Sequence, residues 1–131
     1  MKTLIVEDDF TSRLILQSFL KDYGPTHIAV NGKEAVEAVR LGLDAGEPYD
    51  LICMDIMMPE MNGQQAVKEI RGLEMARGIL SSQGSKIVMT SVLCDMKTVC
   101  AAYASLCDAY LVKPVSQQHL LQELRKLGLV K

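Results

Sequence analysis

Short apolar runs alternate with segments of helical periodicity along the whole chain, and this alternation constrains the fold more than any other feature. Each run is too short for a helix and is typical of a β-strand. The predicted strands are 3–6, 27–30, 49–54, 86–90 and 109–112. Helices are predicted over 10–23 and 96–106, and three others begin near residues 31, 62 and 116. Strands that alternate with helices predict an α/β fold with a doubly wound, five-stranded parallel sheet.

Local signals define several of these elements. Asn31 stands at a helix N-cap position, and Glu34 follows three residues later, where its side chain can reach back. The segment 51–54 is apolar without alternation, which predicts a strand buried on both faces, as in a parallel sheet. Residues 74–85 are less regular, and we expect a helix end followed by a long loop there.

Composition limits the class of protein. The 131 residues are 49% apolar and 23% charged, which suffices for one core, so we expect a single domain over 1–131. The net charge of −2 argues against direct binding to nucleic acid or to an anionic membrane surface. No apolar run approaches the ~20 residues of a membrane span, and acidic residues come too early for a signal peptide. We therefore expect a cytoplasmic protein whose cysteines stay reduced.

Polar residues directly follow or end four of the predicted strands. In chain order they are Glu7, Asp8 and Asp9, then Asp55, then Thr90, and finally Lys113. Because the carboxyl ends of parallel strands share one edge of the sheet, where α/β folds bind ligands, we expect these side chains to converge. Asp9 is the exception, since an acid at that position is typical of the N-cap of the following helix.

The converging set suits phosphoryl transfer. Carboxylates within a few ångströms repel one another, and a hard divalent cation relieves that repulsion. Mg²⁺ prefers oxygen ligands and binds through one or two carboxylates plus a phosphate. Lys113 adds a positive charge, Thr90 a hydroxyl donor, and Asp55 on the central strand is the candidate nucleophile. Positioning and charge stabilisation of this kind are what phosphoryl transfer requires.

These residues resemble the motifs of response-regulator receiver domains. The matching segments are Val6-Glu7-Asp8-Asp9, residues 54–63 (MDIMMPEMNG), Met89-Thr90-Ser91 and Tyr110-Leu111-Val112-Lys113-Pro114. The resemblance covers about residues 2–128, and its second motif is highly specific. It implies a CheY-like, flavodoxin-like fold with strand order 2-1-3-4-5.

The resemblance also implies the chemistry. Asp55 would accept a phosphoryl group from the phosphohistidine of a sensor histidine kinase or a phosphotransfer protein. The implied ligands of Mg²⁺ (or Mn²⁺) are Asp8 directly, Glu7 partly through water, Asp55, and the backbone carbonyl of Met57. Such a domain catalyses only its own phosphorylation and dephosphorylation, and is otherwise not an enzyme.

A switch is implied in the same way. Lys113 would pair with the phosphoryl oxygens, the Thr90 hydroxyl would move onto the phosphoryl group, and the rotamer of Tyr110 would follow. Phosphorylation adds close to two negative charges, so Thr90 gains a strong acceptor and Tyr110 can fill the space that it leaves. The implied output surface, about residues 95–128, would bind a downstream protein target. We expect a monomer or a weak dimer.

Several neighbours of the site depart from the commonest pattern or vary. Ser91 stands where many relatives carry alanine, but it is small enough to keep the site open, and Pro114 follows Lys113. Met57 and Val92 are apolar, which predicts that they shield the phosphoaspartate from water and slow its hydrolysis. A shorter phosphoryl lifetime after Met57→Asn would support this. The stretch 74–85 is a few residues longer than usual for the family. Two interpretations are open, a loop specific for a partner or a tolerated insertion.

Other functional classes fit less well. A phosphatase of the haloacid-dehalogenase type needs a second acid two residues after the nucleophile, where this chain has Met57. A flavodoxin-like flavin carrier needs a phosphate-cradling loop after the first strand, where this chain has acids. The remaining alternative is a receiver-like interaction module that works without phosphorylation. The C-terminus lacks a linker, which favours a stand-alone protein over a piece of a larger regulator.

Overall fold

Five parallel strands form one sheet in the computed structural model, which describes residues 1–56, 58, 61–92, 95–104 and 106–131. The strands are β1 Thr3–Val6, β2 Thr26–Ala29, β3 Leu51–Asp55, β4 Lys86–Ser91 and β5 Ala109–Val112. The helices are α1 Phe10–Leu20, α2 Gly32–Asp44, α3 Gly63–Ala76, α4 Met96–Ala104 and α5 Gln117–Lys126, with a short 3-10 helix η1 at Lys21–Tyr23. The alternation predicted from the sequence is confirmed.

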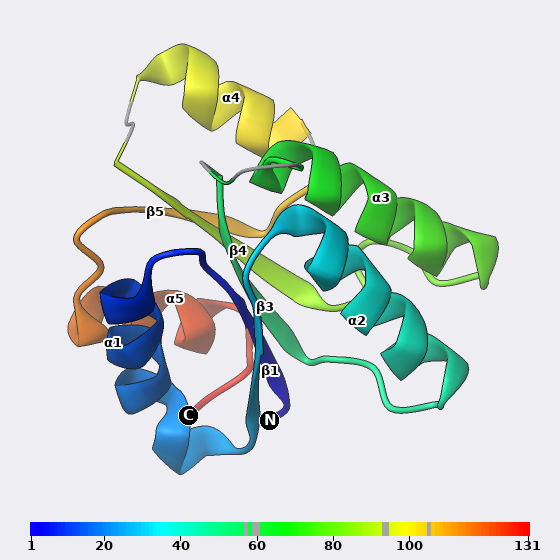
Figure 1. The fold of residues 1–131 in the computed structure, drawn as a ribbon, viewed down its shortest axis with the longest axis horizontal. Helices are drawn as coiled ribbons and strands as arrows, with labels where there is room; N and C mark the ends of the chain where they lie inside the picture. Colours follow the sequence, from blue (N-terminus) through cyan, green and yellow to red (C-terminus); the bar gives the residue numbers. More distant parts are fainter. Residues whose placement is uncertain (57, 59–60, 93–94, 105) are drawn as a thin grey trace.

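The strand order is β2-β1-β3-β4-β5, as the family resemblance implied. Helices α1 and α5 cover one face of the sheet, and α2, α3 and α4 cover the other (Figure 1). In the register, Val6 lies beside Met54, and Asp55 lies beside Thr90. The carboxyl ends of β1, β3, β4 and β5 therefore meet at one edge, which is where the polar residues follow.

The central strands are buried on both faces. Every residue of β1 and β3 is buried, whereas the edge strand β2 exposes His27 and Ile28. One core lies under α2, α3 and α4, and the other lies under α1 and α5. Each fully buried leucine or isoleucine in them contributes about 1.5–3 kcal/mol. The prediction from the continuous apolar run 51–54, a strand buried on both faces, is thus confirmed.

Side-chain caps fix where the helices begin. Asp9, Asn31, Asn62 and Ser116 each accept a hydrogen bond from the backbone N–H three residues later. The assignment of Asp9 to an N-cap is confirmed. The reach of Glu34 differs slightly from expectation, since its Oε1 accepts from the N–H of Val30 at 3.2 Å rather than from the cap residue.

A few boundaries differ from the sequence expectations. The helix predicted over 10–23 changes to the tighter η1 at Lys21 before Gly24 turns the chain with φ 129°. The third strand begins at Leu51 rather than at residue 49, and the second spans 26–29 rather than 27–30. The fourth helix ends at Ala104 rather than 106, because Leu106 has a left-handed φ of 73°. In the described part of the chain, no helix combines the length and hydrophobicity of a membrane span.

Candidate functional site

Three carboxylates meet at the carboxyl edge of the sheet. One oxygen each from Glu7, Asp8 and Asp55 lie within 4.8 Å of one another. Glu7 and Asp8 directly follow β1, Asp55 ends β3, and these strands are neighbours in the sheet. Glu7 and Asp55 are buried, whereas Asp8 is exposed and gives the cluster access to solvent. The structure thus brings together three of the acids selected from the sequence.

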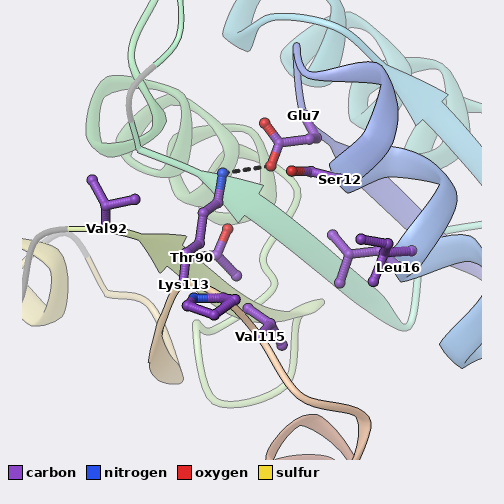
Figure 2. Close-up of a pocket in the computed structure, with 9 residues that line it drawn as sticks. Glu7, Ser12, Leu16, Thr90, Val92, Lys113 and Val115 are labelled. Carbon is purple, nitrogen blue, oxygen red and sulfur yellow. Dashed lines mark hydrogen bonds and ion pairs between the residues drawn. The ribbon is translucent and has the colours of Figure 1, made fainter.

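Lys113 joins this cluster from the end of β5. Its Nζ donates a hydrogen bond to Glu7 Oε1 at 2.6 Å (Figure 2). The same Nζ lies 3.3 Å from Asp55 Oδ1. Its backbone N–H donates to the carbonyl of Ser91 at 2.7 Å, which holds the chain after β5 against the end of β4. The ammonium is therefore positioned over both buried carboxylates.

The charges in the site shift the affinities of its members for protons. Burial, and then the hydrogen bond and charge of Glu7, raise the pKa of Asp55 to about 7 against the opposing effect of Lys113. Burial also opposes ionisation of Glu7, but hydrogen bonds from Lys113 and Asp55 outweigh it and lower the pKa of Glu7. Burial disfavours the ammonium of Lys113, yet its two acidic partners raise its pKa overall. One cation does not fully balance these acids.

Thr90 faces the site from β4. It lies beside Asp55 in the register, is buried, and its carbonyl accepts from the N–H of Ile56 at 3.1 Å. Ser91 is buried next to it, while Val92 is 66% exposed. The proximity of Thr90 to the acids is as the sequence predicted.

The other predicted neighbours lie around this group. Tyr110 is half-buried, lies beside Met89 in the register, and packs against the core under α2, α3 and α4. Pro114 is exposed after Lys113 and joined to it by a cis peptide bond. The predicted roles of Met57 concern a residue outside those that the structure describes.

A cavity of about 330 Å³ adjoins the acids. Its polar lining comes from Glu7, Thr90, Lys113 and Ser12, and its apolar lining comes from Ile15, Leu16, Val92, Pro114 and Val115. Figure 2 shows α1 on one side of this space and Lys113 and Val115 on the other. Sequence analysis missed the contribution of α1, because apolar residues at helical spacing do not show which of them border a cavity.

The role of Arg13 was also not predicted from the sequence. Its Nη1 lies 3.3 Å from the carbonyl oxygen of Glu7 and 3.4 Å from that of Asp8, to which it donates. These contacts hold the backbone that carries both acids. Charge patterning offered no signal for them, since the acceptors are backbone groups.

The donor set fits a hard divalent cation. The three carboxylates supply oxygen ligands close enough to share one ion, which is the coordination that Mg²⁺ prefers. Burial and the neighbouring Glu7 both raise the pKa of Asp55, and a cation between these carboxylates would offset both effects. The residues present therefore suit the metal that the sequence suggested.

Known proteins with related sequences are two-component signalling proteins. The family model of the response regulator receiver domain matches residues 3–125. Two-component response regulator ORR41 of Oryza sativa subsp. japonica is 33% identical over 123 residues, which are 92% of this chain and 88% of that protein. Sensor histidine kinase GacS of Pseudomonas protegens is 33% identical over 126 residues. That match covers 95% of this chain, which spans only 13% of the kinase.

Solved structures agree with the sequence comparison. The receiver domain of the histidine kinase CKI1 from Arabidopsis thaliana, complexed with Mg²⁺ and BeF₃⁻, superposes with a TM-score of 0.84. It is 30% identical, and the match covers 97% of this chain and 89% of that one. The receiver domain of Ssk1 from Saccharomyces cerevisiae, co-crystallised with the histidine phosphotransfer protein Ypd1, has a TM-score of 0.84 and 32% identity, with 98% and 88% of the two chains covered.

The fold, the strand-end acids and these matches lead to one assignment. The sheet order is that of the receiver fold, and the family model covers most of the chain. The chain belongs to the response regulator receiver domain family, the phosphoacceptor modules of two-component signalling and phosphorelays.

Proposed function

We propose that residues 1–131 form one receiver domain in which Asp55 accepts the phosphoryl group. The observation that carries this is the position of Asp55, buried at the end of the central strand with Glu7, Asp8 and Lys113 around it. Asp55 is the acid that contacts Lys113 and also lies beside Thr90. Glu7 and Asp8 are then available, together with Asp55, to hold a cation.

Glu7, Asp8 and Asp55 would hold Mg²⁺ or Mn²⁺, together with the backbone carbonyl of Met57. When bound, the ion neutralises charge on the acids and on the phosphoryl oxygens. The Mg²⁺-containing CKI1 receiver supports this choice of metal. Asp8 is the exposed member of the set and supplies the entry side.

The transfer itself is a displacement at phosphorus. A carboxylate oxygen of Asp55 forms the new P–O bond while the P–N bond to the partner's histidine breaks, and the bonding electron pair returns to the imidazole nitrogen. Asp55 must be ionised to act, so its elevated pKa makes it sensitive to the charges around it. Lys113 and the Thr90 hydroxyl stabilise the charge on the transferred oxygens. The domain thus acts on itself and turns over no other substrate.

The same contacts provide a switch. In the structure Lys113 pairs with Glu7 and Asp55, and a phosphoryl group on Asp55 would give its ammonium new oxygens to bind. Thr90, buried beside Asp55, would turn its hydroxyl toward them, and Tyr110 would move into the space that Thr90 leaves. The change would reach the α4–β5–α5 surface, where a downstream protein target binds.

The proposed donor is a sensor histidine kinase or a phosphotransfer protein. The match to the GacS kinase and the complex of the Ssk1 receiver with Ypd1 support this class of partner. We propose a cytoplasmic location, where the thiols of Cys53, Cys100 and Cys107 would remain free. A monomer or weak dimer fits this role.

Intact-mass measurement after incubation with Mg²⁺ and acetyl phosphate tests the proposal. We expect the gain of one phosphoryl group, absent from Asp55→Asn and from samples without Mg²⁺. Asp22→Asn, which removes an exposed aspartate far from the site in sequence, is the matched control and should be phosphorylated normally. A folded wild-type protein that gains no mass would instead favour a module that works without phosphorylation.

A further inference from the structure

A buried group of charges lies at the edge of the sheet opposite the acids. Arg71 on α3 is 4% exposed, and its Nη1 donates to Glu74 Oε1 at 2.7 Å. Its Nη2 donates to Asp108 Oδ2 at 2.8 Å, just before β5 begins. We call Arg71, Glu74 and Asp108 the Arg71 cluster. Two acids and one guanidinium leave it with one net negative charge when all are ionised.

Backbone groups complete the Arg71 cluster on two sides. On the side of β4, the carbonyl of Ser85 accepts from Arg71 Nη1 at 2.8 Å, and the N–H of Ser85 donates to Glu74 Oε2 at 2.8 Å. Gly84 comes so close that an added Cβ would overlap the Glu74 carboxylate. The end of the loop after α3 therefore packs directly against these charged side chains.

The other side of the Arg71 cluster contacts Leu106, which follows α4 in the chain. Arg71 Nε donates to the carbonyl of Leu106 at 3.0 Å, and the N–H of Ile87 donates to Asp108 Oδ2 at 2.8 Å. Leu106 has a φ of 73°, a left-handed conformation that costs a residue with a Cβ on the order of 1 kcal/mol. Arg71 thus bonds to a strained residue that follows the end of α4, and the N–H of this residue donates to the carbonyl of Tyr103 in α4 at 3.0 Å.

The rest of α4 is held far less firmly. Ala102 is the one buried residue of α4, all nine residues of which the structure describes. The helix lies on the outside of its layer (Figure 1), and Asp95 caps its first turn through the N–H of Thr98 at 3.0 Å. That end follows β4, which carries Thr90 and Ser91 to the acids. The contacts of Leu106 with the Arg71 cluster therefore lie at the C-terminal end of the helix, whereas its N-terminal end follows β4 in the chain.

We propose that the Arg71 cluster is the pivot of α4. Arg71 is a positioning residue that holds Leu106, whose N–H donates to the carbonyl of Tyr103 in the last turn of α4. Events at Asp55 would then displace only the first half of the helix. The trigger of this movement rests on the proposed function, whereas the pivot itself exists in the unmodified protein. Without the pivot, phosphorylation would shift the whole of α4. The output surface would then no longer have one defined arrangement before phosphorylation and another after it.

Hydrogen–deuterium exchange of the full chain tests the pivot, first without phosphorylation. Arg71→Lys keeps the charge but cannot bond to Glu74, Asp108 and Leu106 together. We expect amides 106–108 to exchange about tenfold faster in this variant. Arg77→Lys is the matched control, since Arg77 lies at the same end of α3 but bonds to Asp44 and the carbonyl of Leu73 instead. Unchanged exchange in Arg71→Lys would overturn the proposal.

Two further variants separate a pivot from general destabilisation. Leu106→Gly accepts the left-handed φ without strain, so its addition to Arg71→Lys should restore much of the protection of 106–108. If Arg71→Lys does not fold, Asp108→Asn replaces it, because the amide oxygen can still accept from Ile87 while the ion pair is lost. Faster exchange over the entire chain, with no rescue by glycine, would contradict a local role.

The second comparison adds acetyl phosphate and Mg²⁺, with intact mass read on the same samples. Phosphorylated wild type should change exchange in 95–99 and leave 106–108 unchanged, whereas phosphorylated Arg71→Lys should change in both. Equal changes at both ends of the wild-type helix would overturn the pivot. A wild-type protein that gains no phosphoryl mass would contradict the proposed function, and the first comparison would still decide the pivot.

Discussion

The ammonium of Lys113 lies 2.6 Å from Glu7 Oε1, so two residues that are 106 positions apart form a largely buried ion pair in the site. The carboxylate of Glu7 is 1% exposed and depends on this partner for compensation. Lys113 also lies 3.3 Å from Asp55, the weaker of its two contacts. Glu7 thus holds the ammonium of Lys113 next to Asp55, the residue that we propose accepts the phosphoryl group.

Lys113→Met should slow phosphorylation of Asp55 by about 100-fold, because a positioned charge aimed at the transferred oxygens is lost. Glu7 would also lose its partner, which should lower the free energy of unfolding by on the order of 1–3 kcal/mol. Mass spectrometry against time with acetyl phosphate gives the rate, and urea unfolding gives the stability. Lys126→Met, which removes a 72% exposed ammonium paired with Glu123, should change neither. Equal rates in the two variants would refute this role of Lys113.

Asp55→Asn should stabilise the metal-free protein at pH 8. The pKa of Asp55 is about 7 in the folded protein against an ordinary 3.8, so the folded state binds this proton more tightly than the unfolded state. The stabilisation from Asp55 is therefore present below about pH 4 and is lost as the pH rises through 7. We expect a gain on the order of 1–3 kcal/mol at pH 8 that vanishes near pH 4. Urea unfolding in EDTA measures it, and a less stable variant at pH 8 would contradict the prediction.

Mg²⁺ binding should weaken as the pH falls through 7, because the cation and the proton compete for Asp55. With a pKa of about 7, the ionised fraction of Asp55 drops roughly tenfold between pH 8 and pH 6, and the affinity should fall in proportion. Calorimetric titration with Mg²⁺ at the two pH values measures this. Equal affinity at pH 6 and pH 8 would contradict this competition between the cation and a proton for Asp55.

The strands, the caps and the convergence of the acids could be predicted because each depends on local pattern. Apolar runs gave the strands, and parallel strands necessarily bring the residues at their carboxyl ends together. The strand order came only with the family resemblance, since alternation does not determine which strands are neighbours.

Long-range polar contacts away from the carboxyl ends of the strands could not be predicted. Arg71 and Glu74 are three residues apart on a helix, a spacing typical of exposed ion pairs, yet they are 4% and 1% exposed. Their burial depends on Ser85, Leu106 and Asp108, which only the folded chain brings near. The cavity beside α1 was missed for the same reason, because its walls come from four separate segments.

Gly63→Ala should disturb the site without touching a charged group. Gly63 begins α3, and an added Cβ would overlap the carbonyl oxygen of Asp55 and lie 2.9 Å from the Cα of Ile56. The N–H of Gly63 donates to the carbonyl of Ile56 at 3.0 Å, so the helix cannot retreat without losing that bond. We expect a loss of about 1–3 kcal/mol in the free energy of unfolding and slower phosphorylation.

Gly72→Ala is the matched control for this prediction, since the same helix has open space around that position. An alanine there should stabilise α3 by about 0.5–1 kcal/mol and leave phosphorylation unchanged. Urea unfolding and the mass-based rate, measured on both variants, separate close packing against Asp55 from the general effect of an alanine in α3. If Gly63→Ala behaved like Gly72→Ala in both measurements, the contact between the start of α3 and the strand of Asp55 would not position the site.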